Sequence, residues 1–286
     1  MRNDLDGNDL FSYIMLLQTA PSPKKYIVCE GDSDCAVLDP HINDYTCETI
    51  PGYGKNSVLE AMLIAEQRNL RDIAALIDRD WEKDRLPVSS LAVKTDFYDI
   101  DATVFYSGDV CRRVVGAFCD REEVRKFIGL GSWDSPLEPV TELAFPIGIL
   151  RKLNFEGGWG IRFSDTPFRE VALAGARGVD IERTVLSAIE RSKKPRVGIS
   201  DVASIVDIAT DAMAEVDDKP AYCCGHDLNG ALAYLMTSKW RGRINRTSLE
   251  RAMRAAFSCK ELFSTTLHTA LPSALNCISS EVFTCE

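Results

Sequence analysis

The sequence predicts an α/β fold, with a mainly parallel, Rossmann-like sheet flanked by helices and a helical C-terminal region. Short apolar runs at residues 26–29 and 73–77 are bounded by polar residues, as is typical of strands buried on both faces. A helical pattern lies between these two runs, and strands that alternate with helices indicate a parallel sheet. Beyond about residue 108 the helical patterns become long and no strand pattern recurs.

The chain therefore divides into an N-terminal helical segment of residues 1–23, a core of residues 24–107 and a mainly helical region of residues 108–286. We expect the helical region to pack on the core. A helix at residues 9–18 ends before the Pro-Ser-Pro sequence of residues 21–23, which breaks helical structure.

Within the core, the elements follow in order. A short helix is predicted at 33–39 and a strand at 45–50. Ser57 and Glu60 have capping-box spacing, which predicts that the next helix begins near Asn56 or Ser57. Further strand patterns lie at 91–94 and 97–101. The helical region is expected to contain helices at 108–129, 138–153, 180–193, 200–216, 226–239 and 247–263.

Composition excludes several classes of protein. The longest nearly continuous apolar run, residues 143–150, is far shorter than the roughly 20 residues of a membrane span. The acidic N-terminus is unlike a signal peptide, so we expect a cytoplasmic protein with no membrane partner. A net charge of −10 argues against coating nucleic acid through bulk charge, but it is compatible with an enzyme whose carboxylates surround metal ions.

The ten cysteines include no C-x-x-C pair, and in a cytoplasm we expect reduced thiols that fill the core. A zinc site formed by Cys223, Cys224, His226 and Cys259 would have a spacing that matches no common structural zinc site. His41 and His268 stand in no recognisable metal-binding or catalytic pattern.

Acidic residues follow the predicted strands of the core. Functional groups of an open parallel sheet gather at the carboxyl ends of its strands. Three pairs of acids are placed there, namely Glu30 with Asp34, Asp78 with Asp80, and Asp99 with Asp101. Alternate residues of a strand face the same side, so each Asp-x-Asp pair can point into one site.

Carboxylates this close repel one another unless a cation lies among them. Oxygen ligands select Mg²⁺ or Mn²⁺, and two such ions can activate water and stabilise the leaving oxygen of a phosphodiester. The structural alternative is that these acids cap the following helices or face solvent.

The segments that carry these acids resemble a known fold family. The segment Ile27-Val28-Cys29-Glu30-Gly31-x-x-Asp34, followed by Ala75-Leu76-Ile77-Asp78-Arg79-Asp80, is similar to the Toprim domain of topoisomerases, primases and related nucleases. Gly54-Lys55-Asn56-x-Val58-Leu59 and Gly225-His226-Asp227-Leu228 resemble the DUF4435 branch of that fold. One member type of this branch is the nuclease effector of the PARIS anti-phage defence system, which partners an ABC-type ATPase sensor and attacks host tRNA.

The resemblance covers residues 24–101 and implies roles for individual acids. Glu30, Asp78 and Asp80 match the Toprim motifs, as catalytic residues and metal ligands. Asp34 matches the acid that follows the first motif, and Asp34 and Asp101 are expected to complete the set of metal ligands. A further acid of the branch corresponds to Asp101, although this segment lacks the usual Asn and Asp99 can substitute.

Lys55 precedes a predicted helix N-terminus, where anions are stabilised. It is interpreted either as a contact to a substrate phosphate or as a solvated lysine of the loop.

Basic residues and one histidine leave both functional and structural interpretations open. The stretch 239–254 contains Trp240 and six basic residues, and a second basic group spans residues 183–196. Each either binds a nucleic-acid backbone or forms a solvated helix face, because acids are interleaved in both. For His226, a structural role at a helix start is favoured over general acid–base catalysis.

Two hypotheses for the function follow. The first is a Mg²⁺- or Mn²⁺-dependent Toprim endonuclease acting on RNA, including host tRNA, or on DNA. It would be the toxic effector of a bacterial anti-phage defence system, and the resemblance implies an ATPase partner and an active homodimer. The alternative is a non-catalytic Toprim-like subunit that docks on a partner ATPase and regulates it.

Overall fold

The computed structural model describes residues 6–80 and 87–285, and it confirms the predicted α/β class. The first five residues of the expected N-terminal segment lie outside the described residues. The chain forms two compact units. The sheet unit comprises residues 1–108 and 257–286, and the helical unit comprises residues 109–256.

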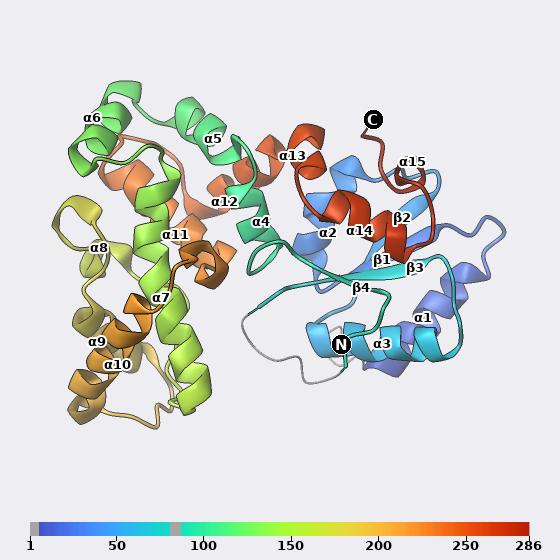
Figure 1. Ribbon diagram of the computed structural model, residues 1–286, viewed down its shortest axis with the longest axis horizontal. Coiled ribbons are helices and arrows are strands. Elements are labelled where there is room, and N and C mark those ends of the chain that lie inside the picture. Colours follow the sequence, from blue (N-terminus) through green and yellow to red (C-terminus); the bar gives the residue numbers. More distant parts are fainter. Residues whose placement is uncertain (1–5, 81–86, 286) are drawn as a thin grey trace. The chain divides into compact units, whose positions relative to one another are not determined.

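The sheet has four parallel strands in the order β2-β1-β3-β4 (Figure 1). Their bounds are Lys25–Cys29 for β1, Cys47–Pro51 for β2, Ile73–Ile77 for β3 and Ala92–Lys94 for β4. Tyr26 is in register with Ile73, and Cys29 with Leu76. Every residue of β3 is buried, as expected for a central strand with both faces covered.

Helices cover the sheet on both faces (Figure 1). On one face, α1 (Gly7–Gln18) packs against α3 (Lys55–Gln67), and both share a core with Val28, Ala75 and Ile77. The alternate strand residues face the other side. There α2 (Asp32–Leu38) packs on β1 and β2, and α14 (Leu267–Ala274) packs on β3 and β4. The remaining elements of this unit are η1 (Asp39–His41), α4 (Ile100–Tyr106), α13 (Cys259–Phe263) and α15 (Ser279–Val282).

The strand order creates a topological switch point between β1 and β3. From β1 the chain moves to β2 on one side, and it then crosses to β3 on the other side of β1. The connections that leave β1 and β3 therefore diverge, and such a point is where open parallel sheets bind ligands. Glu30 directly follows β1 and Asp78 directly follows β3, so both lie at this point.

Three expectations for the sheet unit were wrong. Residues 97–101 form no strand, because Asp99 caps α4 and residues from Ile100 onward are helical. The helix expected to begin near Asn56 or Ser57 does begin there, at Lys55, but the capping box expected from Ser57 and Glu60 is wrong, because Gly54 is the N-cap and Glu60 accepts a hydrogen bond from the Gly7 amide. Residues 257–286 group with the sheet, not with the helical region, since α14 covers the face of β3 and β4.

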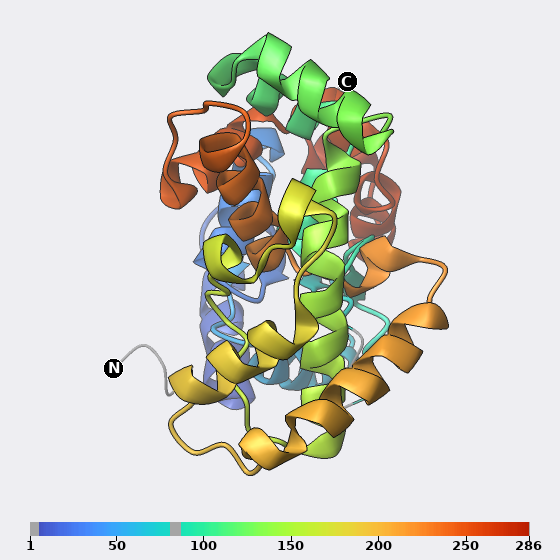
Figure 2. The same cartoon turned by 90° about the vertical axis from the view of Figure 1, so that its left-hand side faces the viewer.

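The helical unit is built from helices of very different lengths (Figure 2). The long helix α7 (Leu137–Gly157) has more buried residues than any other helix of the unit, and it packs against α10 (Val202–Ala214) and α11 (Gly225–Ser238). The other helices are α5 (Val110–Phe118), α6 (Arg121–Gly131), α8 (Phe168–Val171), α9 (Ile181–Arg191) and α12 (Arg246–Ala256), with short 3-10 turns η2 (Ala174–Ala176), η3 (Ile199–Asp201) and η4 (Lys219–Tyr222). None of the helices that the structure describes is long and apolar enough to cross a membrane.

Two of the helices predicted for this part of the chain are interrupted. The helix expected at 108–129 is broken where Asp120 accepts hydrogen bonds from the Glu122 and Glu123 amides and so starts α6. The helix expected at 247–263 ends at Ala256, and Ser258 starts α13. These polar caps stop one helix and begin another because their side chains satisfy free backbone amides.

A buried ion pair joins α7 to α11 in the helical unit. Asp227 is only 1% exposed, and its two oxygens accept bonds of 2.8 and 3.0 Å from Nε and Nη2 of Arg151. Burial raises the pKa of the Asp227 carboxyl, but the hydrogen bond from His226 and the Arg151 guanidinium outweigh burial and lower it overall. Asp227 is thus an ionised group whose charge is matched by Arg151.

Replacing Arg151 is expected to destabilise the helical unit strongly. Arg151→Met leaves the Asp227 charge buried without its cation, which costs about 3 kcal/mol of unfolding free energy. Arg162→Met is the control, because the Arg162–Asp165 pair is exposed and worth less than about 1 kcal/mol. Urea unfolding followed by circular dichroism measures the free energy of unfolding of both variants. Equal losses of unfolding free energy in the two variants would contradict the role given to the buried Arg151–Asp227 pair.

Candidate metal-binding site at the sheet edge

Glu30 and Asp78 lie side by side at the carboxyl edge of the sheet. The Asp78 amide donates a 2.8 Å hydrogen bond to Oε1 of Glu30. The parallel pairing of β1 with β3 brings this about, because it places the first residues after both strands next to each other. The sequence predicted that acids at the strand ends meet at one edge of the sheet, and Glu30 and Asp78 do so.

The loop before α3 is fixed against the same edge. The Gly52 amide donates to the Cys29 carbonyl at 2.7 Å, and the Gly54 amide donates to the Glu30 carbonyl at 2.9 Å. A Cβ atom at position 52 would lie 2.3 Å from Cγ2 of Val58, and Gly54 has a φ of +125°. Glycine is therefore needed at both positions. The hydrogen bonds of this loop place Lys55 next to Asp78 and Asp80.

Lys55 is neither solvated nor free to meet a substrate in this structure. Its Nζ donates 2.8 Å hydrogen bonds to the Asp78 carbonyl oxygen and to Oδ2 of Asp80. Its side chain is only 18% exposed. A cation therefore already lies between the two residues of the predicted Asp-x-Asp pair.

Asp78 and Asp80 do not share a strand, because β3 ends at Ile77. Asp80 has a left-handed backbone with a φ of +47°, and its amide donates to the Tyr98 carbonyl at 3.0 Å. The alternation of strand residues therefore does not place these two carboxylates on one side, as was expected. The turn after β3, and not a shared strand face, sets where the Asp80 carboxylate lies.

Asp34 and Asp99 serve as helix caps at this edge. Oδ2 of Asp34 accepts a 2.8 Å bond from the Gly31 amide at the start of α2, and Oδ1 of Asp99 accepts a 2.7 Å bond from the Ala102 amide at the start of α4. Both carboxylates nevertheless lie close enough to Asp78 to raise its pKa. Asp101 lies in the first turn of α4, so it is Asp99 that the structure brings towards the Glu30–Asp78 pair.

Burial and mutual repulsion shift the pKa values of the two central acids upward. Burial raises the pKa of Glu30 to about 7, although the Asp78 amide and the Lys55 ammonium act to lower it. Burial, and then the charges of Glu30, Asp99, Asp34 and Asp80, raise the pKa of Asp78 to about 9. Without a further cation, Asp78 therefore carries a proton at neutral pH.

These residues fit a hard divalent cation in the chemistry of their donors. The site offers carboxylate oxygens, and its acids are held where their charges repel, an arrangement that a cation relieves. Across the described residues, however, no three carboxylates of this edge have oxygens that all lie within 4.8 Å of one another. Glu30, Asp78 and Asp80 would have to move inward, and Asp80 would have to leave Lys55, to ligate one ion together.

The basic stretch of residues 239–254 is only partly available for nucleic acid. Trp240 is fully buried and packs edge-to-face on Phe127, so it offers no stacking surface. Arg246 binds Asp165 and Glu250. The exposed basic side chains of this stretch are Arg241, which pairs with Glu123, together with Arg243 and Arg251.

In the second basic group, Arg183 and Arg191 donate to backbone carbonyls. His226 lies at the start of α11, with its ring nitrogens 3.3 Å from Asp165 and 3.4 Å from Asp227.

Sequence reasoning missed a different cluster in the sheet unit. His41, Cys259 and Cys285 lie together, and Cys259 forms a disulfide with Cys285, contrary to the expectation of reduced thiols throughout. Cys259 therefore belongs with Cys285 and not with Cys223 or Cys224. No spacing signal reveals this group, because its members are far apart along the chain.

Comparison with protein-family models gives no match for this chain, and comparison with curated proteins gives no significant match.

The raised pKa values make the metal-free protein less stable as the pH rises. An acid whose folded pKa exceeds its unfolded value of about 4 binds more protons when folded, so stability falls from about pH 4 up to the folded pKa. For Glu30 that range extends to about pH 7 and for Asp78 to about pH 9. Asp78→Asn should raise the melting temperature of chelator-treated protein at pH 8, and it should reduce the fall in melting temperature between pH 5 and pH 8.

Asp32→Asn is the control for this measurement, because Asp32 is an exposed acid in the first turn of α2. Thermal melts at pH 5 and pH 8 should show no rise in its melting temperature above that of the wild type. A destabilised Asp78→Asn variant at pH 8 would contradict the charge repulsion described for this site.

Proposed function

We propose that the protein is a Mg²⁺- or Mn²⁺-dependent nuclease whose active site is the acidic edge at the β1–β3 switch point. The observation that carries the proposal is the Glu30–Asp78 pair, held together by a 2.8 Å hydrogen bond with both pKa values raised. Acids kept in repulsion at a switch point lower stability, and such strain is expected where a function requires it.

In this proposal the metal supplies an activated water and stabilises the leaving oxygen of the phosphodiester. Glu30, Asp78 and Asp80 would hold the ion, and Asp34 and Asp99 would keep the local potential negative. In the other role proposed for it, Glu30 would not ligate the ion but would act as the general base that accepts a proton from the attacking water.

Lys55 has a defined task in the same proposal. Its ammonium compensates Asp80 in the structure described here. If Asp80 ligated a divalent ion, Lys55 would lose this partner and would lie beside the site, where its ammonium could neutralise a substrate phosphate oxygen. Asp101, in the first turn of α4, is assigned no direct contact with the metal.

The resemblance to Toprim nucleases suggests the cellular role, the substrate and the partners of this proposed nuclease. It supports a cytoplasmic effector of anti-phage defence that cleaves RNA, including host tRNA, or DNA. It also supports an ABC-type ATPase partner and an active homodimer. Exposed Arg243 and Arg251 offer contacts to a nucleic-acid backbone.

One observation favours the alternative of a non-catalytic subunit that docks on an ATPase. The Lys55 ammonium occupies Asp80, and the carboxylates of the described edge are not gathered into a three-ligand set within 4.8 Å. A site permanently neutralised by its own lysine would have no need of a metal.

Cleavage of total cellular RNA and plasmid DNA with Mg²⁺ or Mn²⁺ distinguishes the two functions. Glu30→Gln and Asp78→Asn should each lower the rate at least about 100-fold, because each removes a ligand or proton acceptor from the reaction. The exposed Asp32→Asn should cleave as the wild type does. The fragments formed identify the substrate as RNA or DNA.

Equal cleavage by the wild type, Glu30→Gln and Asp78→Asn would refute the assigned site. If none of the three proteins cleaves, growth of the cells that express them distinguishes a latent nuclease from a docking subunit. Arrest that is lost in Glu30→Gln indicates a latent nuclease, whereas absence of arrest in the wild type supports the docking subunit.

A further inference from the structure

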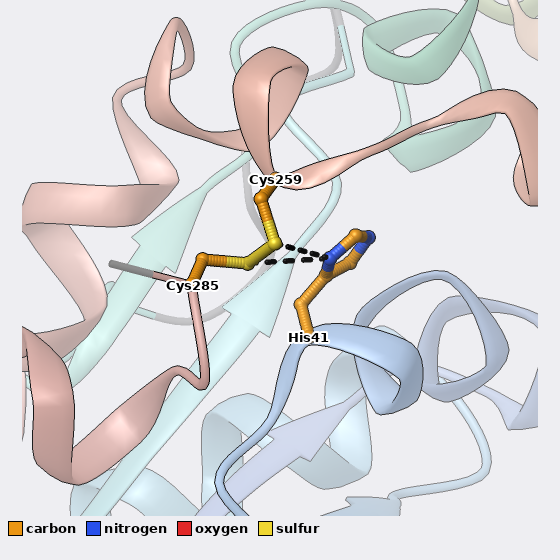
Figure 3. Close-up of side chains that lie close together, drawn as sticks. All are labelled: His41, Cys259 and Cys285. Atoms are coloured by element: carbon orange, nitrogen blue, oxygen red, sulfur yellow. Dashed lines mark hydrogen bonds between the residues drawn. A yellow bond between two sulfur atoms is a disulfide. The ribbon is translucent and has the colours of Figure 1, made fainter.

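A second group of metal-binding side chains lies in the sheet unit, outside the acidic edge. Nδ1 of His41 lies 3.5 Å from Sγ of Cys285 and 3.9 Å from Sγ of Cys259 (Figure 3). The three ligand atoms all lie within 4.8 Å of one another. The two sulfur atoms form a disulfide in this structure, with Cα atoms 5.4 Å apart.

The backbone holds these side chains together independently of the disulfide. The Thr284 amide donates to the His41 carbonyl at 2.8 Å, and the Asn43 amide donates to the Val282 carbonyl at 2.8 Å. Ile42 and Phe283 also form an antiparallel bridge. Cys285 is therefore kept beside His41 when the sulfur–sulfur bond is absent.

The His41 ring is buried beside the two cysteines. It is 4% exposed, and its Nε2 is buried without a hydrogen bond among the described residues. Its Nδ1 points at the two sulfur atoms (Figure 3). A buried imidazole directed at two cysteines has the composition of a Cys₂His zinc site, which leaves one tetrahedral position for water.

We propose that His41, Cys259 and Cys285 form a redox-gated Zn²⁺ site. An external dithiol supplies two electrons and two protons to the disulfide, becomes a disulfide itself and leaves Cys259 and Cys285 as thiols. Both thiols then release their protons as their sulfurs bind Zn²⁺, and neutral His41 contributes Nδ1. In the reverse direction an external disulfide accepts two electrons from the two thiolates and two protons from solvent, and so becomes a dithiol; the Cys259–Cys285 disulfide re-forms, two ligands are lost and the ion is released.

Both states of the site fasten the C-terminal segment to the sheet unit, but with different links. The disulfide joins the start of α13 to the end of the chain, whereas zinc also joins both to His41 at the end of η1. Because α14 lies between the two cysteines and packs on β3 and β4, the link acts on one covering layer of the sheet. The site does not depend on the proposed nuclease activity.

Cobalt binding to the full chain tests this proposal, because Co²⁺ bound by thiolates has charge-transfer absorption and responds to competition by Zn²⁺. Protein reduced with a phosphine should bind one Co²⁺ with these bands, and diamide-oxidised protein should bind none. Cys259→Ser and Cys285→Ser should abolish the bands, and His41→Ala should weaken binding at least about tenfold. Cys277→Ser, a half-buried free cysteine of the same unit, is the matched control and should bind as the wild type does.

Three outcomes would overturn the proposal. They are absence of the thiolate bands in reduced wild type, bands that persist in both serine variants, and equal binding by the oxidised and reduced protein. Circular dichroism checks the fold of each variant. If Cys259→Ser does not fold, Cys285→Ser decides, since backbone hydrogen bonds hold its segment next to His41.

Discussion

The hydrogen bond from the Asp78 amide to Glu30 is the contact on which the acidic edge depends. It joins the residues that directly follow β1 and β3, so the pairing of two central strands places the Glu30 carboxylate against the Asp78 backbone. The Glu30 side chain cannot turn away from Asp78 without loss of this bond. Burial at the end of the sheet, and then the charges of the neighbouring acids, raise the pKa of Glu30 to about 7 and that of Asp78 to about 9.

Lys55 offsets part of the negative charge of this edge. The glycine loop bonded to the end of β1 directs the lysine toward Asp80 and the Asp78 carbonyl. One internal cation and one retained proton therefore offset the charge of the site. In the proposed function both would be exchangeable, the proton with solvent and the ammonium with a divalent ion.

The sequence predicted those features that depend on neighbouring strands. Buried apolar runs predict β1 and β3, and parallel strand ends predict that Glu30 and Asp78 meet. It did not predict that Asp80 turns toward Lys55, because this requires a left-handed residue after β3. Contacts between distant segments carry no local signal, which is why the placement of residues 257–286 and the approach of His41 to Cys259 and Cys285 were missed.

Calorimetry of Mn²⁺ binding at pH 7 in buffers of different ionisation enthalpy tests the central claim most directly. If Glu30 and Asp78 are protonated acids that ligate a metal, the wild type should release about one to two protons per ion bound. Asp78→Asn should bind more weakly and release fewer protons. Binding without proton release, or with release unchanged in Asp78→Asn, would contradict the account.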